Sequence, residues 1–279
     1  MKRILIIGSN DIATASALRL FRSGFDVALV SLENPLDLYH FRNFSTVTII
    51  GSKTISGVKA LTFADFIYNL PEKTTINLLE FIEFSFKNRR VPVLTNKDCQ
   101  IVNIESFDFI IVADADLFIK LNFGQMTNAT VISCVENCPG LINYSIAVNS
   151  DFLGQVKYPF IDFPDATNKQ DLKYEPVYSV KEGVFVSDKN IGDTVKKGEV
   201  IAHLNDQVVI AENEGYIDGQ VRDGVIVPEN AEIVRVRDYS KRSDHKILPS
   251  SSFAIAGGVL EAVLYHNKSN LNKLRKKEH

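Results

Sequence analysis

The sequence of 279 residues lacks several features that define large classes of proteins. It has three cysteines, and an odd number without a secretory leader argues against a disulfide framework. Acidic and basic residues nearly balance, with a formal net charge of −3, so there is no overall positive field of the kind that nucleic-acid-binding proteins use. No apolar run approaches the ~18 residues of a membrane span, and no basic segment precedes an apolar one as in a signal peptide. We therefore expect a cytoplasmic protein with no membrane and no nucleic-acid partner.

Sequence signatures of catalysis and of metal binding are missing as well. There is no G-x-S-x-G elbow, Walker loop or H-E-x-x-H motif. The spacing Cys134-x-x-x-Cys138 suits a shared metal or a disulfide, but no histidine lies near it, and buried free thiols are the simpler interpretation, as for Cys99. No catalytic or metal-binding residue is predicted, and whether the chain is an enzyme stays open. The five histidines show no metal-ligand spacing and are His40, His203, His245, His266 and His279.

What the sequence does contain is 45% hydrophobic and 23% charged residues, which suffices for a packed core. Residues 1–160 alternate β-type and α-type patterns, which predicts a Rossmann-like α/β domain with a parallel sheet. We expect strands at Ile4–Ile7 and Val27–Val30, with a helix from Asp11 to Ser23 between them.

The second half of the chain has a different texture. Residues 161–176 are polar and aperiodic and are interpreted as a linker. Residues 177–238 combine short β-type runs with frequent glycines, which predicts a small all-β domain with tight turns. Residues 239–279 contain a C-terminal helix that we expect to pack back on the α/β domain.

The turn after the first strand is the first candidate ligand site. At a strand-to-helix turn, backbone amides point outward and favour an anion, such as the phosphate of a nucleotide. The alternative is a plain tight turn in which Ser9 or Asp11 caps the helix. The candidate residues are Gly8, Ser9, Asn10 and Asp11.

A second candidate is the glycine pair Gly257 and Gly258, ahead of the helix-like run Val259–Tyr265. One interpretation is that its amides open a helix toward a ligand, and the other is close helix packing or a chain reversal. Because ligands of parallel sheets bind beyond the carboxyl ends of the strands, we predict that this pair lies near Gly8–Asp11 and frames one crevice with it.

Residues 183–236 resemble the biotinyl/lipoyl family, a flattened barrel-sandwich of two similar halves. The resemblance is carried by Gly192-Asp193-x-Val195-Lys196-Lys197-Gly198 and by Ala211-x-x-x-Gly215. Members that carry a cofactor attach it to a lysine at the tip of a hairpin. No lysine lies between Gly198 and Ser240, and Leu204–Gln207 occupies the expected tip. We therefore expect no biotin and no lipoate.

The whole chain resembles the accessory proteins of the selenium-dependent molybdenum hydroxylase system, a family without a defined biochemical activity. The resemblance implies a role in maturation or cofactor handling, with a molybdenum hydroxylase or its maturation proteins as partners and a nucleotide as a candidate ligand. The segments that carry the resemblance are Gly8–Thr14, Leu18–Leu20, Gly24–Val27, Phe44–Ser45, Gly57–Ala60, Val91–Leu94, Pro139–Gly140, Leu153–Gly154, Arg222–Gly224 and Gly257–Ala262.

The chain departs from that family pattern where a ligand would bind. Asn10 stands in place of a second glycine, and its side chain would crowd a phosphate. Ser31 replaces the carboxylate expected at the end of the second strand, and Tyr39 and His40 replace two basic residues. Three functions follow: an accessory protein with a degenerate nucleotide pocket, a non-catalytic scaffold or binding protein, and a nicotinamide-dependent oxidoreductase. The last would need a better glycine loop and an acid at Ser31.

Overall fold

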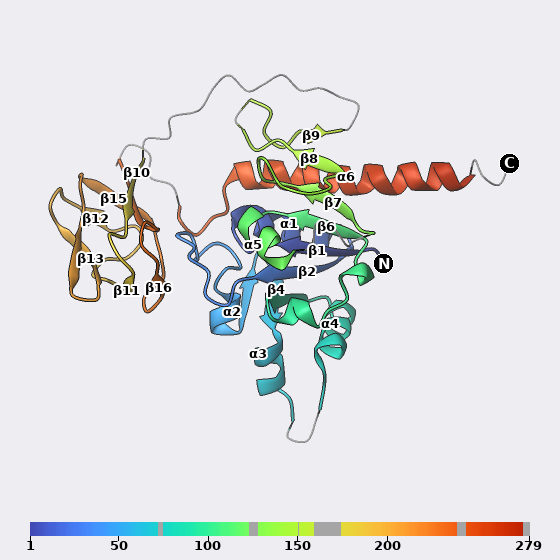
Figure 1. Ribbon diagram of the computed structural model, residues 1–279, viewed down its shortest axis with the longest axis horizontal. Helices are drawn as coiled ribbons and strands as arrows, with labels where there is room; N and C mark the ends of the chain where they lie inside the picture. Colours follow the sequence, from blue (N-terminus) through green and yellow to red (C-terminus); the bar gives the residue numbers. More distant parts are fainter. Residues whose placement is uncertain (72–74, 123–127, 150, 159–173, 239–243, 276–279) are drawn as a thin grey trace. The chain divides into compact units, whose positions relative to one another are not determined.

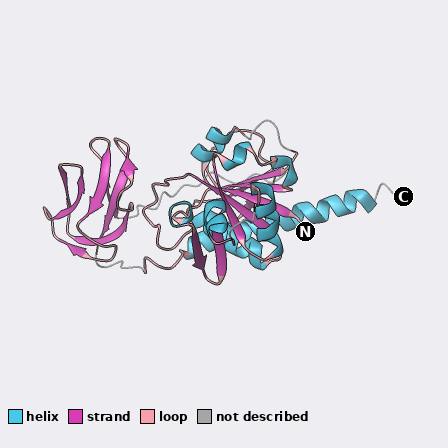
Figure 2. Cartoon of the chain, turned by 90° about the horizontal axis from the view of Figure 1, so that it is seen from below, coloured by secondary structure: helices cyan, strands magenta, loops and turns pink. Residues whose placement is uncertain are grey.

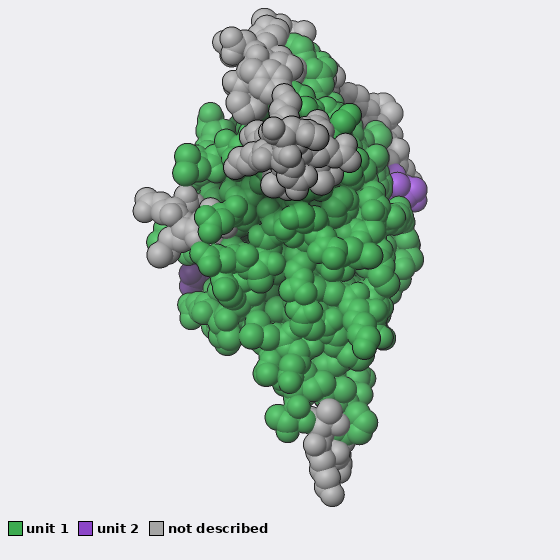
Figure 3. All heavy atoms as spheres, turned by 90° about the vertical axis from the view of Figure 1, so that its right-hand side faces the viewer, with its two compact units in different colours: residues 1–33, 47–169, 249–279 green, residues 34–46, 170–248 purple. Residues whose placement is uncertain are grey.

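The chain divides into two compact units, coloured separately in Figure 3. Unit 1 comprises Met1–Glu33, Val47–Lys169 and Pro249–His279, and unit 2 comprises Asn34–Thr46 and Gln170–Leu248. The boundaries differ from the predicted ones at residues 34–46, which belong with the β unit although they lie within the predicted α/β domain. The computed structural model describes residues 1–71, 75–122, 128–149, 151–158, 174–238 and 244–275.

Unit 1 is built on a nine-stranded sheet with the order β3-β4-β5-β2-β1-β6-β7-β8-β9 (Figure 1). The strands from β4 to β8 in this order run parallel, whereas the edge strands β3 and β9 pair antiparallel with their neighbours. The prediction of a parallel sheet is therefore correct for its centre and wrong for its edges. The strands are β1 Arg3–Ile7, β2 Asp26–Ser31, β3 Ser52–Ile55, β4 Val58–Thr62, β5 Val91–Thr95, β6 Phe109–Val112, β7 Thr130–Ser133, β8 Tyr144–Ile146 and β9 Val156–Lys157.

Helices cover both faces of this sheet (Figure 2). Successive strand residues point to opposite faces, so a strand buried on both sides reads as a continuous apolar run. This explains why Ile4–Ile7 is entirely apolar and almost fully buried. Leu5 and Ile7 share a core with α3, α4 and α5, and α1 packs against α6. The helices are α1 Asp11–Arg22, α2 Val47–Ile50, α3 Phe63–Tyr68, α4 Leu78–Lys87, α5 Ala115–Leu121 and α6 Ser250–Arg275, with short 3-10 helices η1 Asp98–Gln100 and η2 Ile104–Ser106.

Unit 2 consists of two four-stranded antiparallel sheets that share one hydrophobic core. The strand orders are β10-β17-β15-β12 and β14-β13-β11-β16. This agrees with the predicted small all-β domain. The strands are β10 Tyr174–Tyr178, β11 Gly183–Ser187, β12 Thr194–Val195, β13 Val200–Leu204, β14 Gln207–Ile210, β15 Gly215–Gln220, β16 Ile226–Val227 and β17 Glu232–Arg237.

Candidate functional site

Gly8 ends β1 in a backbone conformation that favours glycine, with φ of +122°. Its amide donates to the carbonyl oxygen of Val30 at 2.9 Å. A Cβ atom at this position would lie 3.2 Å from the Cβ atom of Asp114. Gly8 is therefore required by the backbone of the turn and by close packing, whether or not a ligand binds.

Asn10 is the N-cap of α1, whereas the interpretation of the turn as a plain tight turn assigned the cap to Ser9 or Asp11. Its backbone is extended, with φ of −66°, and its side chain accepts a hydrogen bond from the amide of Ala13 at 3.0 Å. Its side-chain amide also donates to the carbonyl oxygen of Ala113 at 2.9 Å. Asp11 follows as the first helical residue, where a carboxylate interacts favourably with the helix dipole. Asn10 and Asp11 thus provide locally the acceptor and the negative charge that an anion would otherwise supply.

Ser9, in the turn after β1, contacts Ser31 at the end of β2 through their side chains. Their hydroxyl oxygens lie 2.7 Å apart in a hydrogen bond, and the two residues are 7% and 0% exposed. Ser31 is the last residue of β2, where dinucleotide-binding sheets place the carboxylate that binds a ribose. In this protein the Ser31 hydroxyl group is hydrogen-bonded to Ser9.

Gly257 and Gly258 lie inside α6, which begins at Ser250, so the interpretation that they precede a helix is wrong. A Cβ atom at Gly258 would lie only 2.1 Å from the carbonyl oxygen of Gly154, and the atoms nearest to Gly257 belong to Arg19. The contact of Gly258 with Gly154 agrees with the alternative interpretation, close helix packing. No contact between this pair and Gly8–Asp11 is seen among the described residues, and the shared crevice stays a prediction.

Residues 34–46, which we call the strap, belong to unit 2 although they are distant in sequence from its strands. Leu38 of the strap is 8% exposed and is part of the β-unit core. Its carbonyl oxygen accepts a hydrogen bond from the amide of Gln220 at 3.0 Å. A Cβ atom at Gly219 would lie 3.0 Å from the ring of Tyr39 and 3.1 Å from Leu38, so a glycine in β15 allows the strap to approach.

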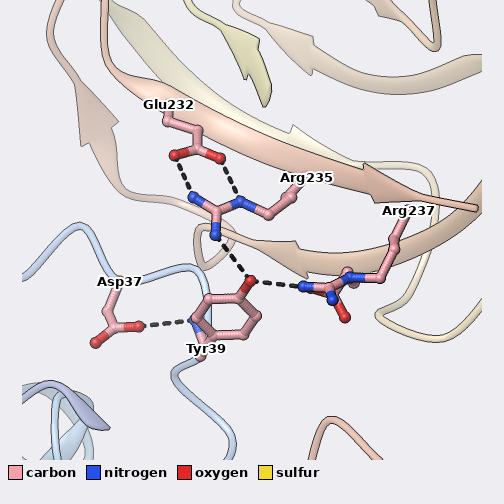
Figure 4. A network of polar contacts seen from close by, with 6 residues as sticks. Asp37, Tyr39, Glu232, Arg235 and Arg237 are labelled. Carbon is pink, nitrogen blue, oxygen red and sulfur yellow. Dashed lines mark hydrogen bonds and ion pairs between the residues drawn. The ribbon is translucent and has the colours of Figure 1, made fainter. Parts of the chain in front are cut away.

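Tyr39 connects the strap to charged residues of β15 and β17 (Figure 4). Its hydroxyl group donates to Oδ2 of Asp218 at 2.9 Å and accepts from Arg235 at 3.0 Å. Arg237 donates to the same Asp218 oxygen at 2.8 Å, and Glu232 holds Arg235 through two contacts of 2.6 Å. We call these five residues the Tyr39 cluster.

The electrostatics of the Tyr39 cluster keep the phenol neutral. Burial raises the pKa of Tyr39 to about 12, while the charge of Arg235 lowers it and that of Asp218 raises it. Asp218 is 2% exposed, and its carboxylate accepts hydrogen bonds from Tyr39, Arg237 and Tyr216, as a buried charge requires. We interpret the cluster as a structural lock, meaning a set of contacts that holds the strap in place, because its side chains bond to one another. Among the described residues, the buried Nε atom of Arg237 has no hydrogen-bond partner.

The two halves of unit 2 are copies of one pattern. Residues 183–204 align without a gap on residues 215–236. Gly192 and Gly224 occupy equivalent positions with φ of +96° and +79°. Each donates its amide to the first strand of the other half at 2.8 Å. The second half differs because the strap covers it: Asp218 is 2% exposed, whereas its counterpart Val186 is 50% exposed.

The hairpin between β13 and β14 turns at Asn205 and Asp206. Asn205 has a positive φ of 51°, and its side chain accepts a hydrogen bond from the amide of Val184 at 3.0 Å. The residue types at this tip offer no amine for an amide-linked cofactor.

Metal sites, membrane-spanning helices and reactive thiols are the other features that could indicate a function. Within the described ranges, no three or more His, Cys, Asp or Glu residues are arranged so that they could hold a metal ion. No helix in the described part of the chain combines the length and apolar character needed to cross a membrane. Burial raises the pKa of the Cys134 thiol, and it raises that of Cys99 to about 12, which disfavours the reactive thiolate form of both.

Together these features describe a protein with one mixed α/β unit and one antiparallel β unit, and with a first turn whose polar groups bond to the protein itself. The chain is similar to "Uncharacterized protein YqeB" of Escherichia coli (strain K12), with 24% identity over 273 residues. The match covers 94% of this chain and 47% of that protein, so the chain spans about half the length of the relative. No family model matches the chain.

Two solved structures show weak likeness. One is a product-bound structure of the ectoine utilization protein EutE (DoeB) from Ruegeria pomeroyi, with 11% identity, a TM-score of 0.21, and coverage of 75% of this chain and 57% of that chain. The other is an aspartoacylase family protein from Mesorhizobium loti, with 11% identity, a TM-score of 0.24 and coverage of 84% of both chains. Scores this low carry no argument about fold or activity.

Proposed function

We propose that this chain is a non-catalytic accessory protein of a selenium-dependent molybdenum hydroxylase system, in which the α/β unit is a scaffold rather than an enzyme. The observation that carries the scaffold role is the hydrogen bond between Ser9 and Ser31, because it occupies the position at which a nucleotide-binding turn needs a free carboxylate. The system itself is proposed from the motifs of the sequence alone, because the name of the similar YqeB protein states no activity.

The β unit fits the same proposal as a docking module of the barrel-sandwich type. Two repeated halves around one core are what a biotinyl/lipoyl-like domain would have. With Asn205 and Asp206 at the hairpin tip, the module would not carry a cofactor arm. Its strap-covered half suits a fixed, structural use of this domain.

A nucleotide-binding function is the competing proposal, supported by the general tendency of the backbone amides at a helix N-terminus to bind anions. Thermal unfolding of the full chain with NAD⁺, NADP⁺, ATP or inorganic phosphate separates the two. The scaffold proposal expects no shift in melting temperature. A ligand at 100 times its Kd adds roughly 2.7 kcal/mol, so a saturable shift would overturn the scaffold proposal. A dehydrogenase of known affinity serves as the positive control.

The accessory role has its own test in the native host. Deletion of the gene is expected to lower the activity and the selenium content of the molybdenum hydroxylase, and the wild-type gene is expected to restore both. Asp11→Asn should restore them equally, because no ligand chemistry is assigned to the first turn. An unchanged hydroxylase after deletion would remove the proposed system, and failure of Asp11→Asn alone would favour a ligand at the turn.

A further inference from the structure

Helix α6 presents a row of residues on its outer surface, which we call the α6 stripe. The members recur every three or four positions, at 257, 260 and 261, 264 and 265, and 268, and therefore share one face of the helix. Together with Tyr158 they line a shallow groove of about 440 Å³. The α6 stripe consists of Gly257, Leu260, Glu261, Leu264, Tyr265 and Lys268.

The middle of the α6 stripe is apolar and exposed. Leu264 is 52% and Tyr265 is 37% exposed. The inner face of the same helix is also apolar, since Val259, Ala262 and Val263 are fully buried. A surface helix normally has one apolar face and one polar face. In Figures 1 and 2 the C-terminal part of α6 also projects beyond the strands of unit 1. The second apolar face therefore suits a partner.

Two opposite charges flank this apolar centre. Glu261 and Lys268 are seven residues apart on the same face, or roughly 10.5 Å along the helix axis, which is too far for a direct ion pair. The carboxylate of Glu261 accepts a hydrogen bond from the hydroxyl group of Tyr158 at 2.7 Å, which orients it. No ion pair of Lys268 is seen among the residues that the structure describes.

This order of charges is self-complementary under a two-fold axis. The midpoint between Glu261 and Lys268 falls between Leu264 and Tyr265. An antiparallel second copy would therefore bring Glu261 opposite the partner's Lys268 and Lys268 opposite the partner's Glu261, with Leu264 against the partner's Tyr265. A parallel copy would instead place like charges together, which is unfavourable.

We propose that the α6 stripe is the contact surface of a homodimer, in which the α6 helices of two copies pack antiparallel around a two-fold axis. The apolar centre provides the affinity, because exposed ion pairs contribute little, and the charges determine the direction of packing. The contact is isologous, as two-fold dimers require. This inference does not depend on the proposed accessory function.

Sedimentation velocity of the full chain over a concentration series tests the dimer. Wild type is expected to dimerise, and Glu261→Lys or Lys268→Glu should each weaken dimerisation by roughly tenfold, because both symmetric pairs become repulsive. The double charge exchange should restore dimerisation to near the wild-type level. Tyr158→Phe keeps the charge of Glu261 and should still dimerise.

Leu264→Asp should abolish the dimer, whereas Leu141→Asp, at a leucine that is 82% exposed, should leave it unchanged. Circular dichroism melts of each variant separate a lost contact from a lost fold. A wild type that stays monomeric up to about 1 mM would overturn the proposal, because a Kd of about 1 mM corresponds to a binding free energy of only about −4.1 kcal/mol. A double exchange that fails to restore the dimer while it folds normally would do so as well.

Discussion

The neighbouring glycines of α6 offer a test in which one substitution should act in opposite directions at two adjacent positions. Both lie in a helix interior, where alanine is favoured over glycine by about 0.5–1 kcal/mol. At Gly257 an added Cβ atom meets nothing closer than Arg19 at 3.8 Å, which is an ordinary contact distance. Gly257→Ala should therefore stabilise unit 1 by about 0.5–1 kcal/mol.

At Gly258 the same methyl group has no room. The added Cβ atom would lie 2.1 Å from the carbonyl oxygen of Gly154 and 2.9 Å from a methyl group of Ile146. Gly154 cannot easily withdraw, because its φ of +83° and its own close approach to the carbonyl oxygen of Ala254 fix the loop. Overpacking of this kind costs about 1–3 kcal/mol, which exceeds the gain in helix propensity. Gly258→Ala should therefore destabilise the unit.

Thermal unfolding followed by circular dichroism measures both effects. For a unit of 150–250 residues, 1 kcal/mol corresponds to a change of roughly 2–4 °C in melting temperature. The melting temperature should rise for Gly257→Ala and fall for Gly258→Ala. Equal shifts of the two variants would refute the close contact between α6 and the loop at Gly154.

Further predictions concern the polar cluster, the helix cap and the thiols. Tyr39→Phe should lower the free energy of unfolding in urea by about 1.5–3 kcal/mol, because the buried carboxylate of Asp218 loses a hydrogen-bond donor. The control Tyr178→Phe, at a half-exposed site, should change it little, and equal effects of the two variants would contradict a structural role for the Tyr39 cluster. The pKa of Tyr39 in the folded protein, about 12, lies above its ordinary value of 10.0. The contribution of Tyr39 to the free energy of unfolding is therefore fully present below pH 10 and is lost as the pH rises to 12, and Tyr39→Phe should reduce this loss of stability. Asn10→Ala should lower stability by about 1–2 kcal/mol in thermal melts, and no change would disprove the cap. A thiol reagent at pH 8 should modify the partly exposed Cys138 before the buried Cys134, and the reverse order would argue against the described burial.

The sequence predicted the elements of unit 1 well where local patterns decide. Ile4–Ile7 reads as a buried parallel strand because both of its faces are covered, and the helix predicted for Asp11–Ser23 matches α1 within one residue. The start of α6 was predicted wrongly because two glycines disfavour a helix in isolation. Packing against Gly154 outweighs that local preference. The sequence of α6 alone gives no indication of this contact, because Gly154 lies about 100 residues earlier in the chain.

The repeat in unit 2 and the strap differ in what the sequence could reveal. Aligning residues 183–204 with 215–236 would have exposed the repeat, because glycines recur at equivalent turns. The strap offers no comparable signal. Tyr39 was noted only as a departure from a family pattern, and its partners Asp218 and Arg235 are distant in the chain. Such pairings depend on tertiary structure alone.

The strap also has a consequence for how the protein is made. Leu38 leaves the ribosome long before the strands β15 and β17 have been synthesised, so the core of the β unit is completed only after most of the chain has emerged. Contacts this distant in sequence slow folding, because a large loop must close first. A truncated chain that begins after the strap would lack Leu38 in the core of the β unit, and the carboxylate of Asp218 would lose its hydrogen bond from Tyr39. The β unit is therefore expected to be a poor candidate for excision or transplantation, although most of it is continuous in sequence.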